Sequence, residues 1–587
     1  MAERLLRAHF IRRFLDNDLI SPDADRHEML ATISAVLIGG GLFITLMMSL
    51  KFLLQVFQSP ARTAVPALND RFFFFGLSMT VMALGALASW NALSLDARDV
   101  AILGPLPIER RTIVRAKLAS VAIVAAGAAT VLNGVTSLLF PVLVVAKLPI
   151  GFVDTGTLIL AHAVVAMAAG AFGFLAVLAV RELLHAALGT ARFMRVSVPV
   201  HATLTVAAIV CLLLLPGLSS GVAQRWLVDP SPLRWRIPPL WFLGLHEYLT
   251  GDIMMRLPHG ELPRWVAGQE ARLSAVYASA QTTFGGLAAV AVFTLVACAA
   301  IALPAYWWNN RRIDGAPQAA RGTGRSLGTR LTTRVVNTIV ARHPLTQAGY
   351  WFGCRSVLRS MPHCVSMATA TAVAIAATII LLPFVTGPTP VSHVRVLLLV
   401  PQIVALIAVV LGFRHAMRLP ADLRANWVFH VAWLGDAGHY ASGVKRFGIV
   451  GIVLPTVLLL APIYVMLLGI ERAAAHALLG AVFGTVLLQL SMLDAERLPL
   501  ACAYTPSSTL KTRGPVYLFA GIAIVYWIGW FERAALATSE GVATFAVVGI
   551  ASYVVLGFIG SQQADTRIPG DVEPPLDEPT QRLGLNA

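Results

Sequence analysis

Long apolar stretches without charged residues dominate this sequence. About 20 consecutive apolar residues cross the hydrocarbon core of a bilayer as a helix. Backbone groups in hydrocarbon must be satisfied within the segment or in a closed barrel, and the alternating pattern of barrel strands is absent. The sequence therefore predicts an all-α, polytopic integral membrane protein. We expect about twelve transmembrane helices, at residues 30–56, 71–95, 118–146, 155–180, 197–219, 281–308, 364–387, 394–413, 448–469, 474–493, 515–531 and 540–560.

The overall composition agrees with this class of protein. Hydrophobic residues make up 57% of the chain and charged residues only 13%, whereas a soluble domain carries about 25% charged residues. The formal net charge is +15, which in a soluble protein would indicate nucleic-acid binding. Because the basic residues fall in loops between the apolar stretches, we expect a lipid bilayer and no nucleic acid as partner.

The distribution of Lys and Arg predicts the orientation in the membrane. If the N-terminus is inside, 32 of the 45 Lys and Arg residues lie in inner segments and 12 in outer ones, with Lys51 inside the first span. Positive residues are retained on the cytoplasmic side. We therefore expect both termini to be cytoplasmic and the protein to lie in the cell's inner (cytoplasmic) membrane.

The loops divide the chain into two halves of six predicted helices. Before the first span of each half lies a basic, aromatic-containing stretch, Leu5–Leu15 and Thr346–Arg359, which suits a helix in the membrane interface. An inner loop with charge and proline follows the second span of each half, so hydropathy and loop placement indicate a parallel repeat. The expected parts are a cytoplasmic interfacial helix at 1–29, a first half at 30–308 with a long outer loop at 220–280, a basic cytoplasmic linker with the second interfacial helix at 309–363, a second half at 364–560 and a disordered cytoplasmic tail at 561–587.

The inner loop Leu95–Lys117 is the most informative segment. Its paired prolines break the helix that leaves the second span, and a short helix is expected over Ile108–Lys117. Such a segment is either an ordinary basic loop or a docking element for a cytoplasmic partner. The residues that we expect to contact the partner are Asp99, Pro107, Arg110, Arg111 and Arg115.

This loop, with an Asp, an apolar pair, Leu-Pro-Ile and then Arg/Lys before the third helix, resembles the membrane subunit of ABC-2-type ABC exporters. Leu419–His430 and Leu500–Pro506 are also similar to inner-loop sequences of fused bacterial ABC permeases. The second half departs from the pattern because no large outer segment matches 220–280. The counterpart docking residues that the resemblance implies are Asp422, Arg424 and Trp427.

The resemblance implies that ATP is hydrolysed by a separate cytoplasmic ATPase subunit, bound as a dimer. The chain has no GxxxxGK[ST] loop, since Lys511 is followed by Thr512 but lacks the preceding glycines. Without glycine, the backbone cannot wrap phosphates closely. We therefore expect no enzyme activity, cofactor or metal in this chain, and ATP on the partner. The lack of charge within the spans favours an amphipathic or apolar substrate over a small ion.

An ion-coupled secondary transporter is an alternative, because such proteins also have two halves of six helices. Proton coupling usually needs an ionisable group within the membrane, and no Asp or Glu lies in the predicted spans away from their ends. His162 is expected to form an interhelical hydrogen bond rather than a proton relay, since the nearest acid, Asp154, lies at the span boundary. The interior polar residues are Asn91, Asn133, His162, Gln402 and Gln489.

A membrane-embedded enzyme acting on lipid-linked substrates is the second alternative. Asp96 and Asp99 are spaced for one helix face, but the basic residues around them favour salt bridges over a metal site. In the outer loop an HExxH motif fails because Thr250 stands where the second His is needed. The other outer-loop candidates are His246, Glu247, Asp252 and His259.

Overall fold

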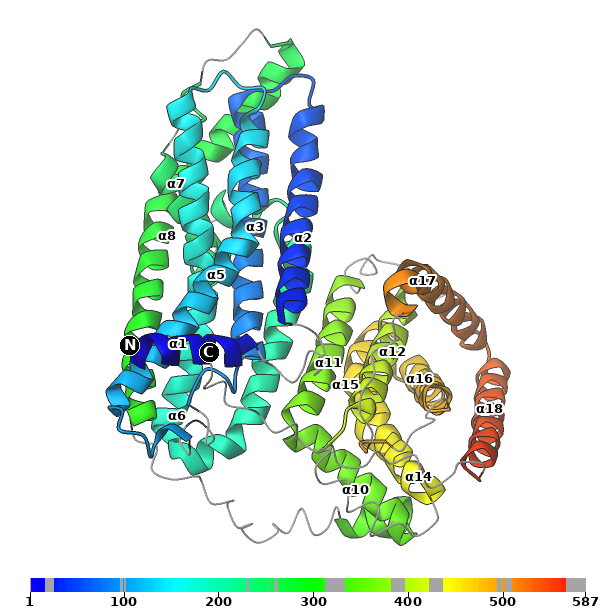
Figure 1. Cartoon of the computed structure of the whole chain (residues 1–587). Coiled ribbons are helices and arrows are strands. Elements are labelled where there is room, and N and C mark those ends of the chain that lie inside the picture. The colour runs from blue at the N-terminus through cyan, green and yellow to red at the C-terminus, as the bar shows by residue number, and fades with distance from the viewer. Residues whose placement is uncertain are drawn as a thin grey trace. The chain divides into compact units, whose positions relative to one another are not determined.

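The computed structural model is helical throughout the part of the chain that it describes (Figure 1). The described residues are 2–15, 26–95, 99, 102–228, 232–251, 253–257, 262–311, 333–381, 396–421, 437–493, 499–501 and 509–565. Among them, ten helices are long and apolar enough to cross a membrane, and no strand occurs. The protein is therefore an all-α polytopic membrane protein, as the sequence predicts.

The chain divides into two compact units. The first comprises Met1–Ser197 and Cys211–Ala320, and the second comprises Val198–Val210 and Arg321–Ala587. The helices of the first part of the chain are α1 (Ala2–Leu15), α2 (Arg26–Leu54), α3 (Pro60–Ala88), α5 (Arg110–Val145), α6 (Phe152–Leu218), the short turns η1 (Ala223–Val228) and η2 (Pro232–Arg236), α7 (Pro238–Thr250) and α8 (Arg264–Arg311). Those of the second part are η3 (Val336–Val340), α10 (Pro344–Arg359), α11 (Met361–Leu381), α12 (Val396–Arg418), α14 (Ala437–Gly448), η6 (Ile449–Val453), α15 (Leu454–Leu468), α16 (Ile470–Ser491), α17 (Thr509–Ala535) and α18 (Ser539–Asp565).

The helix α6 covers two of the predicted spans. It runs for 67 residues with a non-helical backbone at Gly189 (φ 70°, ψ 162°), a region that glycine enters without steric cost. The kink at Gly189 divides it into two helical parts, each long enough to cross a bilayer core of about 30 Å. The α17 helix matches another predicted span but does not belong to the ten. The number twelve and the cytoplasmic termini stay predictions.

The described residues of the segment 220–280, the predicted outer loop between two spans, are mostly helical. Pro238 and Pro239 occupy the first helical positions of α7, where proline's missing N–H costs nothing. The α7 helix packs against α3 and α8, and α8 itself begins at Arg264. The buried side chains Phe242 and Leu243 join α7 to the core of the first unit.

Aromatic rings and close helix crossings hold the first unit together. Phe72 and Phe75 of α3, Phe140 of α5 and Phe242 of α7 are at most 1% exposed. At the crossing of α3 and α6, a Cβ on Gly173 would lie 2.1 Å from the Met79 carbonyl oxygen. Only glycine allows this approach, so backbone contact as well as side-chain packing fixes the two helices.

The two units share one local arrangement. In the first, α1 packs against α5 and runs crosswise to α2, α3 and α5 (Figure 1). In the second, α10 packs against α14, which continues through η6 into α15. Both α1 and α10 precede the first spanning helix of their unit, and both contact the helix that leads into its third. The parallel repeat itself stays a prediction.

Candidate functional site

The predicted docking segment forms the beginning of α5. The short separate helix expected over Ile108–Lys117 is not formed, because α5 starts at Arg110 and continues without interruption to Val145. Pro107, Arg110, Arg111 and Arg115 are exposed, as docking residues must be. Asp99 differs from them because it is only 2% exposed. Its carboxylate therefore belongs to the packing of the loop rather than to an exposed contact surface.

The interfacial helix α1 is fixed to these first turns of α5. Phe10 is fully buried and Leu6 is 7% exposed, which places the i, i+4 pair on the packed face. The Lys117 ammonium lies 4.8 Å from the centre of the Phe10 ring, a cation–π distance. The Ser120 hydroxyl lies 3.2 Å from the Arg7 carbonyl oxygen and donates to it. Movement of the α5 N-terminus therefore moves α1 as well.

The second unit repeats this contact with glycine. A Cβ on Gly349 of α10 would lie 2.1 Å from the Tyr440 carbonyl oxygen, and one on Gly443 of α14 would lie 2.1 Å from the Thr346 carbonyl oxygen. The Thr346 hydroxyl also donates to the His439 carbonyl oxygen at 3.2 Å. The helices α10 and α14 thus touch backbone to backbone. The predicted counterparts Asp422, Arg424 and Trp427 lie outside the described residues.

Two ionisable groups of α10 remain neutral near pH 7. Burial raises the pKa of the Tyr350 phenol, and the neighbouring Cys354 raises it further. Burial also raises the pKa of the Cys354 thiol, against the lowering effect of Arg355 and Arg359. A protonated thiol is a poor nucleophile, so Cys354 has a packing role.

Several carboxylates are buried in the helices at or beyond the ends of the predicted spans, so the absence of acids within the membrane stays a prediction. The predicted spans are shorter than the helices: α3 begins at Pro60, so Asp70 lies well inside it, and α17 continues past Glu532. Hydropathy does not give the ends of these helices, because an apolar stretch ends at the first charged residue whereas the helix continues past it. The buried carboxylates within helices are Asp70, Glu182, Glu247, Glu270 and Glu532.

Glu247 is the centre of an ionic network that joins three helices. Arg71 of α3 donates from Nη1 to Glu247 Oε1 at 2.7 Å, and the Tyr277 hydroxyl of α8 donates to Oε2 at 2.9 Å. His246 Nδ1 lies 2.9 Å from Oε1. Both oxygens are therefore engaged within the network. Sequence reasoning selected His246 and Glu247 but missed Arg71 and Tyr277, while Asp252 and His259 lie outside the described residues.

Glu270 at the start of α8 caps the N-terminus of α3. Its carboxylate accepts hydrogen bonds from the Ser59 hydroxyl at 2.5 Å, the Ala61 N–H at 2.7 Å and the Arg62 N–H at 3.0 Å. The first N–H groups of a helix have no intrahelical partner, and a carboxylate there also interacts favourably with the helix dipole. This carboxylate fixes where α3 begins.

Two further carboxylates are paired in the same unit. Lys51 of α2 donates to Asp70 of α3 at 2.6 Å. In α6, Arg181 pairs with Glu182, whose other oxygen accepts from the Asn309 amide of α8 at 2.8 Å. These contacts join helices to one another and have the geometry of structural ion pairs.

His162 forms none of the interhelical hydrogen bonds expected of it. Among the described residues, neither ring nitrogen has a hydrogen-bond partner, and the side chain is fully buried. Its neighbours are rings: the centroids of Phe75, Phe140 and His246 lie 5.2, 5.4 and 5.9 Å away. The surroundings are those of an aromatic packing position rather than a proton relay.

The second unit contains a polar cluster from four helices. His476 Nδ1 of α16 lies 2.5 Å from Glu532 Oε1 of α17. The Gln402 amide of α12 donates to the His476 carbonyl oxygen at 2.9 Å, and the ring of Tyr464 of α15 lies 4.2 Å from that of His476. Within the described part of the chain, Gln402 Oε1 and His476 Nε2 have no hydrogen-bond partner. Sequence reasoning noted Gln402 alone.

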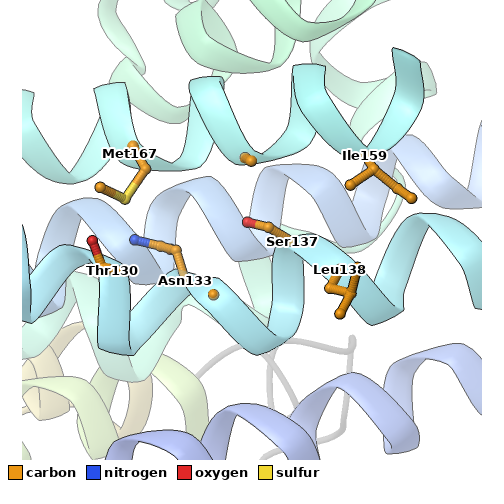
Figure 2. Close-up of a pocket in the computed structure, with 8 residues that line it drawn as sticks. Thr130, Asn133, Ser137, Leu138, Ile159 and Met167 are labelled. Atoms are coloured by element: carbon orange, nitrogen blue, oxygen red, sulfur yellow. The ribbon is translucent and has the colours of Figure 1, made fainter. Parts of the chain in front are cut away.

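A cavity of about 280 Å³ lies between α5 and α6. Figure 2 shows the polar ends of Thr130, Asn133 and Ser137 on the side of α5 that is turned toward α6. The lining residues are Thr130, Asn133, Gly134, Ser137, Leu138, Ile159, Ala163 and Met167. Of these, only Asn133 was marked by the sequence, as an interior polar residue.

A metal centre has no support from the described residues, where no group of three or more His, Cys, Asp or Glu could hold a metal ion. Asp96, one of the two acids weighed as a metal pair, lies outside them.

Comparison with known proteins gives no match to a family model, a curated protein or a solved structure.

Proposed function

We propose that this chain is the membrane permease of an ABC-2-type exporter, with both halves in one polypeptide and ATP hydrolysed by a separate cytoplasmic ATPase dimer. The observation that supports this most directly is the exposed basic start of α5 with α1 bound to it. Arg110, Arg111 and Arg115 occupy the first two turns of a helix that continues into the apolar core without a break. A partner that moves these turns therefore moves a membrane-spanning helix.

The second unit supports the same mechanism because α10 is bound to α14 in the corresponding place. ATP-driven closure of the ATPase would displace both contact regions and shift the spanning helices between two arrangements. The neutralised carboxylates fit this role, since Glu247, Asp70 and Glu182 each have a cationic partner and need no proton. In this proposal the chain lies in the cell's inner membrane with both termini in the cytoplasm.

Charge reversal at the start of α5 tests the proposal. We expect R110E/R111E to lose the co-purifying Walker-type ATPase when the tagged full chain is isolated from native membranes, because the basic surface would repel its partner. The matched control is R192E/R195E, which reverses two exposed arginines elsewhere on the predicted inner side. If R110E/R111E retains the ATPase as well as the control does, the docking assignment is wrong.

An ion-coupled transporter is the second candidate, and the His476–Glu532 pair favours it. A buried imidazole–carboxylate pair in the helices of a membrane protein is a common element of proton pathways. The purified chain, reconstituted without any ATPase, distinguishes the two candidates. Solute uptake driven by a pH gradient and lost in E532Q would establish the transporter, whereas an exporter permease shows none.

A further inference from the structure

Polar side chains recur along one face of α5 in the middle of an apolar helix. Thr130, Asn133 and Ser137 are separated by three and four residues, so they lie one above another on the same face. The facing wall is apolar, formed by Ile159, Ala163 and Met167 of α6 at intervals of four. The cavity between them therefore has one hydrogen-bonding wall and one hydrocarbon wall (Figure 2).

The Ser137 hydroxyl is an unsatisfied group in this cavity. Ser137 is 6% exposed, and within the described structure its Oγ has no hydrogen-bond partner. The Thr130 hydroxyl donates to the Ala126 carbonyl oxygen and the Asn133 amide to the Ala129 carbonyl oxygen, both at 2.9 Å, which leaves their oxygens as acceptors. A buried polar group without a partner is destabilising, and hydrocarbon supplies no water to satisfy it. A bound ligand with its own polar groups would remove that cost.

The lining also restricts the class of ligand. No residue that lines the cavity is charged, which disfavours ions and phosphorylated headgroups. Leu138 is 57% exposed on a helix that is long and apolar enough to span the membrane, which fits an opening of the cavity toward lipid. Its volume of about 280 Å³ lies just below the usual range for ligand pockets, about 300–1,000 Å³. The space suits part of an elongated molecule.

We propose that this cavity, named here the α5–α6 groove, binds a membrane-dissolved amphipathic molecule whose apolar body carries hydroxyl or amide groups. The molecule enters from the lipid, packs against Ile159, Ala163 and Met167, and exchanges hydrogen bonds with Ser137, Asn133 and Thr130. That such a molecule is the exported cargo rests on the proposed function, whereas the binding itself does not.

Filling the groove gives the sharpest test. A Cβ built on Gly134, which lines the groove, meets nothing within 4 Å, and the same holds for Gly127 on the same helix outside the lining. Both positions have room for a Cβ, so we expect the Gly134→Leu side chain to fill the groove, and Gly127→Leu is its matched control. The probe is a photoactivatable long-chain alcohol with a mid-chain hydroxyl, applied to the purified full chain in lipid nanodiscs, with cross-links located by mass spectrometry.

We expect cross-links at α5 and α6 in the unaltered chain and in Gly127→Leu, and at least a fivefold loss in Gly134→Leu. Ser137→Ala should lower labelling by the alcohol two- to tenfold, the equivalent of one hydrogen bond, and leave labelling by the matching hydrocarbon unchanged. The serine control is Ser279→Ala, at an exposed position of α8. Equal labelling of Gly134→Leu and Gly127→Leu, or equal loss of both probes in Ser137→Ala, overturns the proposal. The labelling experiment contains no ATPase, so its outcome does not depend on the docking assignment. If R110E/R111E retains the ATPase in the co-purification experiment while the groove is still labelled, the docking assignment is wrong and the groove proposal stands.

Discussion

At the residue scale, Glu247 shows how a charge can be retained in an apolar core. Its two oxygens receive three polar contacts from Arg71, His246 and Tyr277, and both Arg71 and Glu247 have side chains less than 5% exposed. The attraction between buried charges offsets their desolvation only when the geometry is good and the remaining lone pairs are satisfied. The network meets that condition, so it holds α7 between α3 and α8.

Removing one member of the network should be more damaging than removing both charges. We expect Glu247→Gln to destabilise the fold by about 3–5 kcal/mol, because it leaves the Arg71 guanidinium buried without its counter-charge. Tyr277→Phe should cost less, about 1.5–3 kcal/mol, since one hydrogen bond to a charged group is lost. The double change Arg71→Met/Glu247→Leu should recover much of the stability. Thermal unfolding of the detergent-solubilised variants measures the order of their stabilities. A double variant less stable than Glu247→Gln would contradict a mainly electrostatic role of the network.

Only part of this network could be predicted from the sequence. His246 and Glu247 are adjacent and were recognisable as a titratable pair, whereas Arg71 is 176 residues and Tyr277 30 residues from Glu247. No local pattern joins residues so far apart, because tertiary packing brings them together. Asp70 and Arg71 were assigned to the boundary of a span for a related reason: their charges lower the local hydropathy even though each is paired in the fold.

At the element scale, the structure and the sequence agree on most helices and differ where composition misleads. Apolar stretches gave the spanning helices, since hydropathy measures what a bilayer requires. The segment 220–280 is predicted as a loop between two spans, and the sequence does not show which of its residues are helical. Pro238 and Pro239 begin α7, and the charges that precede the apolar part of α8 belong to the helix itself. Composition alone does not distinguish a helix-starting proline from a helix-breaking one.

The contact between α10 and α14 gives a prediction at this scale. Gly443→Ala and Gly349→Ala should each destabilise the chain by about 1–3 kcal/mol, the usual cost of overpacking, because a Cβ at either place would lie 2.1 Å from a carbonyl oxygen. Gly521→Ala on α17, where a Cβ meets nothing within 4 Å, should leave stability unchanged or raise it. Unfolding temperatures of the three variants provide the comparison. Equal values for Gly443→Ala and Gly521→Ala would show that the helices do not touch at this point.

At the scale of the whole molecule, the question is how the chain passes through the membrane. The α6 helix is the segment at which this path can be tested. Its 67 residues exceed one span, and Gly189 provides a break near the place where the sequence predicts an inner loop. The expected orientation makes α6 two spans joined on the cytoplasmic side.

Single cysteines in a cysteine-free variant test this path. A membrane-impermeant maleimide should label Val153→Cys in intact cells, since Val153 is 79% exposed at the predicted outer end of α6. Ala191→Cys, close to Gly189, and Arg111→Cys at the start of α5 should react only after permeabilisation. Labelling of Ala191→Cys from outside would reverse the orientation derived from the Lys and Arg distribution.

The unbroken course of α5 has one last consequence. From Arg110 to Leu138 the helix contains no proline, and those residues carry both the exposed arginines and the wall of the α5–α6 groove. If the proposed ATPase binds the exposed arginines, thermodynamic reciprocity links the two sites: a ligand in the α5–α6 groove that changes the affinity for the ATPase by some factor has its own affinity changed by the ATPase by the same factor. Under the proposed function, a ligand that weakens ATPase binding would itself be held less tightly once the ATPase is bound.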